Sequence, residues 1–181
     1  MPKKYKLVGL SGSLRQSATN RKLMIEAARL FDPETLVEGD LKLPLYDGDT
    51  EDAEGIPASV QTLADQIKAA DAVVISTPEY NKGPSGVLKN ALDWVSRTKN
   101  RPWMDKPVAV LYAAAGRAGG ERGLMILRGL IVPFQPLLLP GPEVHVADSG
   151  AAFDAQGRLI DDRYTDALQQ LMDKLKNAAG G

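Results

Sequence analysis

Hydrophobic residues follow two patterns along the chain, one typical of buried strands and one typical of amphipathic helices. Short, continuous apolar runs predict strands at residues 5–10, 72–77 and 108–113. Runs of this kind are typical of parallel strands that are covered on both faces. Two less distinct runs predict a second strand at residues 36–43 and a last strand at residues 137–139.

Apolar residues spaced three and four positions apart predict five helices that alternate with these strands. The helices are expected at residues 21–31, 59–70, 88–97, 124–132 and 161–177. Two segments are expected to be loops. Residues 47–58 are acidic and contain two glycines and a proline, and residues 116–123 contain four glycines.

The alternation of strands and helices predicts an α/β fold. A doubly wound, five-stranded parallel sheet with helices on both faces and strand order 2-1-3-4-5 suits this length and right-handed crossovers. The 181 residues are expected to form a single domain. Ligands of such sheets bind beyond the carboxyl ends of the strands, at the switch point between strands 1 and 3. The loops after strands 1, 3 and 4 are therefore expected to carry the function.

Composition excludes several kinds of chemistry. The chain has no cysteine, which excludes disulfides, thiolate metal sites and a cysteine nucleophile such as that of the low-molecular-weight tyrosine phosphatases. A single histidine, His145, cannot form a zinc site alone, and we expect it to be structural or at the surface. We therefore expect no metal site and no catalytic side chain of the triad kind.

Charge and the N-terminal sequence give expectations about partners and location. The 22 basic and 23 acidic residues leave a net charge of −1, which favours neither nucleic acid nor an anionic membrane as a partner. The first six residues are polar, and the apolar run after them is too short for a signal peptide or a membrane span. We therefore expect a cytoplasmic protein.

The first candidate site is the segment SGSLRQSATN at residues 11–20, between the first predicted strand and helix. Free N–H groups and a partial positive charge at a helix N-terminus bind anions, and Arg15 adds a guanidinium group. The hydroxyl groups that can donate to phosphate oxygens belong to Ser11, Ser13, Ser17 and Thr19. Asn20 is expected either to cap the helix or to bind the ligand.

This segment matches neither GxxxxGK[ST] nor GxGxxG, the patterns of nucleoside triphosphate and dinucleotide loops. It therefore favours a terminal monophosphate. The alternative is a turn rich in serine and threonine that only caps a helix.

The second candidate site is the segment PEYNKGPSG at residues 78–86, after the third strand. Two prolines stiffen it, and Tyr80 with the neighbouring amides can border a planar heterocycle. The alternative is a simple turn before a helix that packs through Leu88 and Leu92.

The segments GSLRQSATN and TPEYNKGPSGVLKNALDW, about sixty residues apart, together resemble the NADPH-dependent FMN reductase family, which includes quinone and chromate reductases. The resemblance implies a flavodoxin-like fold, FMN as cofactor, NADPH or NADH as co-substrate, and a homodimer or homotetramer. It implies an enzyme that transfers hydride from NAD(P)H to FMN and then reduces a small acceptor, such as a quinone, chromate, azo or ferric compound.

The resemblance also implies the residues that bind FMN. The phosphate is expected at Ser13, Arg15, Ser17, Ala18, Thr19 and Asn20. The ribityl chain and ring are expected at Pro78, Glu79, Tyr80 and Asn81, with Ala115 and Gly116 of the 114–117 loop on the far side. The chain departs from the family pattern in three places. Ala18 stands where the family often has a serine, residues 113–115 are all alanine where the loop often carries a serine near the flavin, and Met125 replaces the tyrosine of some tetrameric members.

The glycine-rich segment 116–123 is expected to admit the nicotinamide, and Arg117 or Arg122 to meet a 2′-phosphate; a plain surface loop is the alternative. Three other functions remain open. They are a flavin reductase that supplies reduced FMN to a partner, a flavodoxin-type electron carrier, and a regulator that binds a phosphorylated metabolite without flavin. Electron carriers tend to be strongly acidic, which this chain is not.

Overall fold

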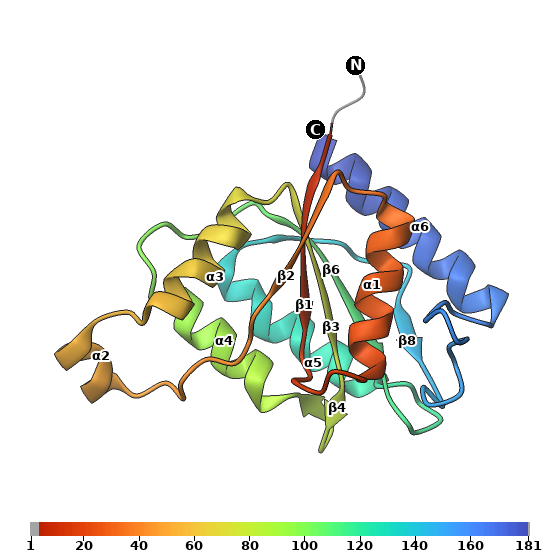
Figure 1. Ribbon diagram of the computed structural model, residues 1–181, viewed down its shortest axis with the longest axis horizontal. Coiled ribbons are helices and arrows are strands. Elements are labelled where there is room, and N and C mark those ends of the chain that lie inside the picture. The colour runs from red at the N-terminus through yellow and green to blue at the C-terminus, as the bar shows by residue number, and fades with distance from the viewer. Residues whose placement is uncertain (1–3, 181) are drawn as a thin grey trace.

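A central parallel sheet runs through the molecule, and helices cover both of its faces (Figure 1). The structure is a computed structural model that describes residues 4–180. The strands of the sheet are β1 (Lys6–Ser11), β2 (Thr35–Gly39), β3 (Ala72–Thr77), β6 (Pro107–Ala113), β7 (Leu137–Leu138) and β8 (Val144–Val146). The helices are α1 (Thr19–Phe31), α2 (Gly48–Glu54), α3 (Ala58–Ala69), α4 (Gly86–Ser96), α5 (Glu121–Ile131) and α6 (Asp162–Gly180). A short 3₁₀ turn, Val132–Phe134, extends α5.

The strand order is β2-β1-β3-β6, followed by an edge position that two short strands share. β7 pairs with the start of β6, at Pro107 and Val108, and β8 pairs with its end, from Leu111 to Ala113. This arrangement confirms the predicted α/β fold and its order 2-1-3-4-5, with a fifth strand in two pieces. β8 was not predicted, because only three residues pair and two prolines, at 140 and 142, separate them from β7.

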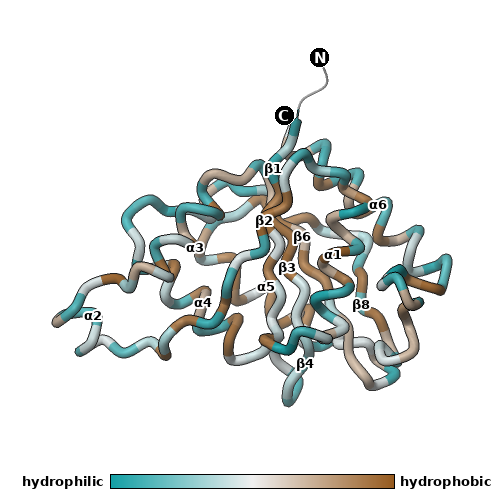
Figure 2. Tube along the Cα trace, in the orientation of Figure 1, coloured by the Kyte–Doolittle hydropathy of each residue, from teal (hydrophilic) through white to brown (hydrophobic). Residues whose placement is uncertain are grey.

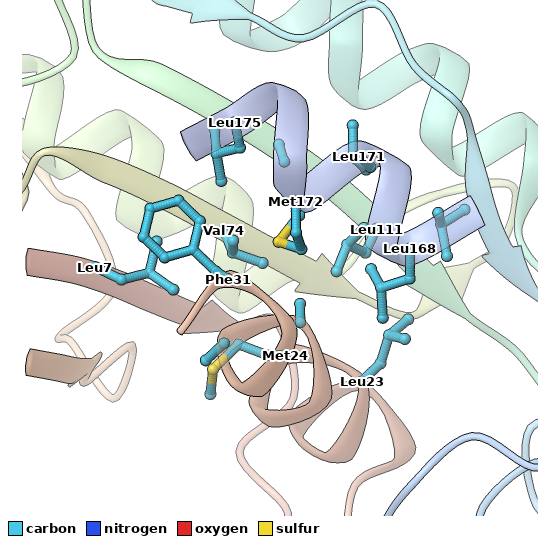
Figure 3. Close-up of a cluster of buried hydrophobic side chains, with 14 of the residues drawn as sticks. Leu7, Leu23, Met24, Phe31, Val74, Leu111, Leu168, Leu171, Met172 and Leu175 are labelled. Carbon is cyan, nitrogen blue, oxygen red and sulfur yellow. The ribbon is translucent and has the colours of Figure 1, made fainter. Parts of the chain in front are cut away.

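Alternate side chains of the strands point to opposite faces and form two separate apolar cores. Leu7 of β1 and Val74 of β3 contact α1 and α6, whereas Val8 and Val73 lie under α3, α4 and α5. Figure 3 shows the first core, where Met172 of α6 reaches toward α1 over the sheet. Hydropathy is highest along these central strands (Figure 2). Burial on both faces explains why their sequences are continuously apolar.

Three sequence predictions need correction. Residues 47–58 are not only a loop, because they contain α2; the Asp47 carboxylate caps this helix by accepting hydrogen bonds from the N–H groups of Asp49 and Thr50. The second strand ends at Gly39, earlier than predicted. The glycine-rich loop ends at Gly120, because Glu121 already begins α5.

None of the helices within residues 4–180 combines the length and the apolar character needed to cross a membrane.

Candidate active site

A cavity of about 690 Å³ lies beyond the carboxyl ends of β1, β3 and β6. All but one of its lining residues come from three loops, residues 13–20 after β1, residues 78–82 after β3 and residues 113–120 after β6; the other is Ser149, after β8. These loops meet at the lower edge of the molecule in Figure 1. The cavity therefore lies at the predicted switch point, and its volume is in the range of ordinary cofactor sites.

Eleven of the twelve residues predicted to bind FMN line this cavity. They are Ser13, Arg15, Ser17, Ala18, Thr19, Asn20, Pro78, Glu79, Tyr80, Ala115 and Gly116. Asn81, the twelfth, is at the tip of a hairpin and is not among the residues that line the cavity. That these residues bind FMN stays a prediction.

The N-terminus of α1 forms one end of the cavity. Its first residue follows Ala18, and no side chain caps the helix. The N–H groups of Arg21 and Lys22 donate hydrogen bonds to the Ala18 carbonyl, while those of Thr19 and Asn20 have no acceptor within residues 4–180. Unpaired N–H groups at a helix start favour an anionic ligand. The exposed Arg15 guanidinium, which forms no ion pair in the described part of the chain, adds positive charge beside them.

The side chain of Asn20 has a different role from the cap that the sequence suggested. Asn20 is only 2% exposed, and its carboxamide bonds both backbone groups of Ala113 on β6. Its oxygen also accepts a hydrogen bond from the hydroxyl of Ser76 on β3. The side chain therefore fixes the start of α1 to two strands, and the backbone N–H of Asn20 is the group left for a ligand.

The loop after β3 is a hairpin, which the sequence pattern did not predict. β4 (Glu79–Tyr80) pairs with β5 (Gly83–Pro84) in an antiparallel bridge. Both residues of the turn, Asn81 and Lys82, have positive φ angles, of 51° and 69°. Such a turn twists a two-residue hairpin in the favoured direction. It leaves Tyr80 55% exposed beside the cavity.

Glu79 joins this hairpin to the opposite wall. Its carboxylate accepts a hydrogen bond of 2.8 Å from the backbone N–H of Gly123 in α5, and the carbonyl of Gly123 accepts one of 2.8 Å from the Tyr112 hydroxyl. Burial, and secondarily the Glu79 carboxylate, raise the pKa of Tyr112. A chain of hydrogen bonds therefore holds the hairpin, α5 and β6 together under the cavity.

Two residues that line the cavity, Ser149 and Lys82, had no predicted role. Ser149 lies after the unpredicted strand β8; its N–H donates to the Ala114 carbonyl, and its hydroxyl is 3.1 Å from that of Thr19. Its position far from both motifs gave no signal. Lys82, by contrast, directly follows the PEYN motif, and its place in the second candidate segment was a usable signal.

Two further findings concern metal ligands and His145. Within residues 4–180, no group of three or more histidine, aspartate or glutamate side chains could hold a metal ion. His145 is half-buried on β8, at the edge of the sheet.

The chain is similar in sequence to a known family and to several named proteins. The sequence profile of the NADPH-dependent FMN reductases matches residues 5–151. The chain is 43% identical to a NAD(P)H-dependent FMN reductase of Pseudomonas aeruginosa, over 94% of this chain and 93% of the other. It is 37% identical to a quinone reductase of Escherichia coli, over 93% and 92% of the two chains.

A solved structure has the same fold. The flavoenzyme NAD(P)H:acceptor oxidoreductase FerB of Paracoccus denitrificans superposes with a TM-score of 0.86, covers 97% of each chain and is 29% identical. The fold, the cavity at its switch point and the profile match over most of the sequence lead to one assignment: this chain belongs to the NADPH-dependent FMN reductase family.

Proposed function

We propose that this protein holds FMN in the cavity at the switch point and catalyses the reduction of a quinone-class acceptor by NAD(P)H. The observation that carries the proposal is the convergence of three loops on one cavity of about 690 Å³. One loop brings helix N–H groups that have no acceptor in the described chain, and another brings an exposed aromatic ring. The relatives named as FMN and quinone reductases support the same activity.

The residues of the cavity fit FMN. The N–H groups of Thr19 and Asn20 and the guanidinium of Arg15 suit the phosphate, because they are donors without acceptors in the described chain. The apolar and backbone surfaces that suit a planar ring belong to Pro78, Tyr80, Ala115 and Gly116. Bound FMN would supply the chemistry by accepting a hydride equivalent from NAD(P)H and passing two electrons to the acceptor.

The protein's own contribution is positioning. The hydrogen bond between Glu79 and Gly123 fixes the separation of the two loops that would border the ring. The carboxamide of Asn20 fixes the helix N-terminus that would receive the phosphate. Neither role requires a nucleophile or a strong base.

The acceptor class is part of the proposal. We favour quinones over chromate, azo and ferric compounds because several similar proteins are named as quinone reductases. The second candidate is a flavin reductase that releases reduced FMN, which the relative from Pseudomonas aeruginosa favours by its name.

Assembly and location are further parts of the proposal. Exposed apolar residues on and after α5, Met125, Ile126 and Val132, support a homodimer or homotetramer in which this face is covered. We also propose that the protein works in the cytoplasm, where NAD(P)H is available.

The decisive experiment is the visible spectrum of the purified protein before and after anaerobic addition of NADPH. Flavin absorbance that NADPH bleaches and a quinone restores is the expected result. A protein that neither binds added FMN nor oxidises NADPH contradicts the proposal. FMN that dissociates after reduction, with no quinone activity, supports the flavin reductase instead.

A further inference from the structure

Lys82 occupies a position where its backbone conformation is unfavourable. It is the second residue of the two-residue hairpin turn and has a φ angle of 69°. Glycine is the preferred residue there, because a side chain in this region of φ is strained. Residues held in such conformations cluster at active sites and ligand clamps. The geometry of the turn therefore does not explain why a lysine is at this position.

The ammonium group of Lys82 is available to a ligand. Lys82 lines the large cavity, and its side chain is 66% exposed. Its nearest carboxylate oxygen, on Glu79, is 3.6 Å away, longer than a charge-assisted hydrogen bond. The other oxygen of Glu79 is bonded to the N–H of Gly123, so this carboxylate is already shared. Glu79 therefore neutralises the Lys82 ammonium group only in part.

The cavity is positively charged although the whole chain is not. Three of its lining residues are cations, Arg15, Lys82 and Arg117, and Glu79 is the one carboxylate among the lining residues within 4–180. The net charge of the chain is −1. Cations gathered in a concave site attract and orient anionic ligands.

The three cations are distributed over three loops. Arg15 is beside the proposed phosphate end, and Arg117 is on the glycine-rich loop. Lys82 is on the ring-side hairpin, two residues after Tyr80. An anionic substituent on a small acceptor is only one or two bonds from the ring that is reduced, whereas the phosphates of a dinucleotide are separated from its nicotinamide by a ribose. The ring-side position therefore suits an anion carried by the acceptor.

We propose that Lys82 is a specificity-determining residue that binds an anionic group on the quinone-class acceptor. The inference rests on the proposed function and deepens it by naming the acceptor subclass: quinones that carry a sulfonate, a carboxylate or an ionised hydroxyl group.

The test compares 1,4-naphthoquinone with 1,4-naphthoquinone-2-sulfonate as acceptors for the FMN-loaded protein. Lys82→Asn removes the charge and keeps a residue that tolerates positive φ, and Lys82→Arg keeps the charge. Lys99→Asn is the matched control, because Lys99 is exposed and does not line the cavity.

Lys82→Asn is expected to lower the ratio of kcat/KM for the sulfonate to kcat/KM for the neutral quinone about three- to fivefold, the size of one exposed ion pair. Lys82→Arg should keep most of the ratio, and Lys99→Asn all of it. High salt should lower the ratio of the unchanged protein toward that of Lys82→Asn, because it screens exposed charges. An unchanged ratio in Lys82→Asn overturns the proposal.

Two further measurements distinguish a failure of the proposed role of Lys82 from a failure of the proposed function. If Lys82→Asn slows reduction by NADPH in a stopped-flow experiment and leaves the acceptor ratio unchanged, its partner is the dinucleotide, and the proposal is wrong. Titration calorimetry with the sulfonate, without NADPH, measures binding directly and should give an affinity about three- to fivefold lower for Lys82→Asn. If the protein fails to oxidise NADPH, the proposed function fails, and this titration still decides the role of Lys82.

Discussion

The side-chain carboxamide of Asn20 bonds both backbone groups of Ala113, accepting from its N–H at 2.9 Å and donating to its carbonyl at 2.8 Å. These two bonds are the ones that a residue of a neighbouring strand would form with Ala113, at the end of β6. Because it is also the second residue of α1, it ties the helix N-terminus to the sheet. The position of the proposed anion site therefore depends on a buried side chain that belongs to the fold.

Asn20→Ala should destabilise the protein and weaken FMN binding together. The change leaves the Ala113 N–H, the Ala113 carbonyl and the Ser76 hydroxyl without their side-chain partner in a buried place. We expect the free energy of unfolding to fall by about 3 kcal/mol in urea titrations. Asn177→Ala, at an exposed asparagine of α6, is the control and should change it by less than about 0.5 kcal/mol. An equally small effect of Asn20→Ala would show that water replaces the lost bonds.

The sequence was sufficient for most of the fold because burial determines the strands that matter. β3 is buried along its whole length, and its predicted bounds, residues 72–77, are those observed. The elements that were predicted wrongly depend on contacts of polar residues. α2 is capped by Asp47 and held by the ion pair of Glu51 with Arg97, and no apolar periodicity marks it.

The parts of the candidate site that each lie in a continuous segment of sequence were predictable. Residues 13–20 and 78–80 lie at the expected ends of β1 and β3, because the order of a parallel sheet brings those ends together. The contact of Ser149 with Thr19 was not predictable, because it depends on how the chain returns along β8. The buried hydrogen bonds of the Asn20 side chain were also not predictable, since a polar residue at a helix start ordinarily faces solvent or a ligand.

Gly123→Ala and Gly129→Ala should have opposite effects on stability although both are in α5. Alanine favours a helix over glycine by about 1 kcal/mol. A Cβ atom at residue 129 would have no neighbour within 4 Å, so this variant should be stabilised by up to about that amount. A Cβ atom at residue 123 would be 2.6 Å from the ring of Tyr112, so this variant should be destabilised by about 1–3 kcal/mol. Thermal and urea unfolding measure both, and equal shifts in the two variants would contradict the close packing of α5 on Tyr112.

Arg15→Ala should weaken FMN binding and leave riboflavin binding unchanged. Riboflavin lacks the phosphate that the Arg15 guanidinium is proposed to bind. The loss of a charged hydrogen bond is worth about 1.5–3 kcal/mol, so the Kd for FMN should rise roughly ten- to a hundredfold in fluorescence titrations. Arg21→Ala is the matched control, because Arg21 is nearby but pairs with Glu38 at 2.8 Å. Equal losses for FMN and riboflavin would assign Arg15 to another part of the ligand.

Alkaline pH should destabilise the protein through Tyr112. The raised pKa of Tyr112, caused mainly by burial, means that the folded protein keeps the phenolic proton at a pH where the unfolded chain has lost it. The contribution of this tyrosine to stability is therefore complete below its ordinary pKa of about 10, and is lost progressively as the pH rises above that value. The slope for one such group reaches about 1.4 kcal/mol per pH unit.

Tyr112→Phe isolates this contribution. Below about pH 10 the variant should be less stable than the wild type by about 1 kcal/mol, because the Gly123 carbonyl loses its hydrogen bond. Above that pH the wild type alone loses stability through residue 112, so the difference between the two proteins should shrink and then change sign. Urea unfolding of both at a series of pH values from about 8 to about 12 measures the difference. A difference that stays constant over this range would mean that the Tyr112 hydroxyl is hydrated in the folded protein, and that the contact between β6 and α5 is looser than the fully buried ring implies.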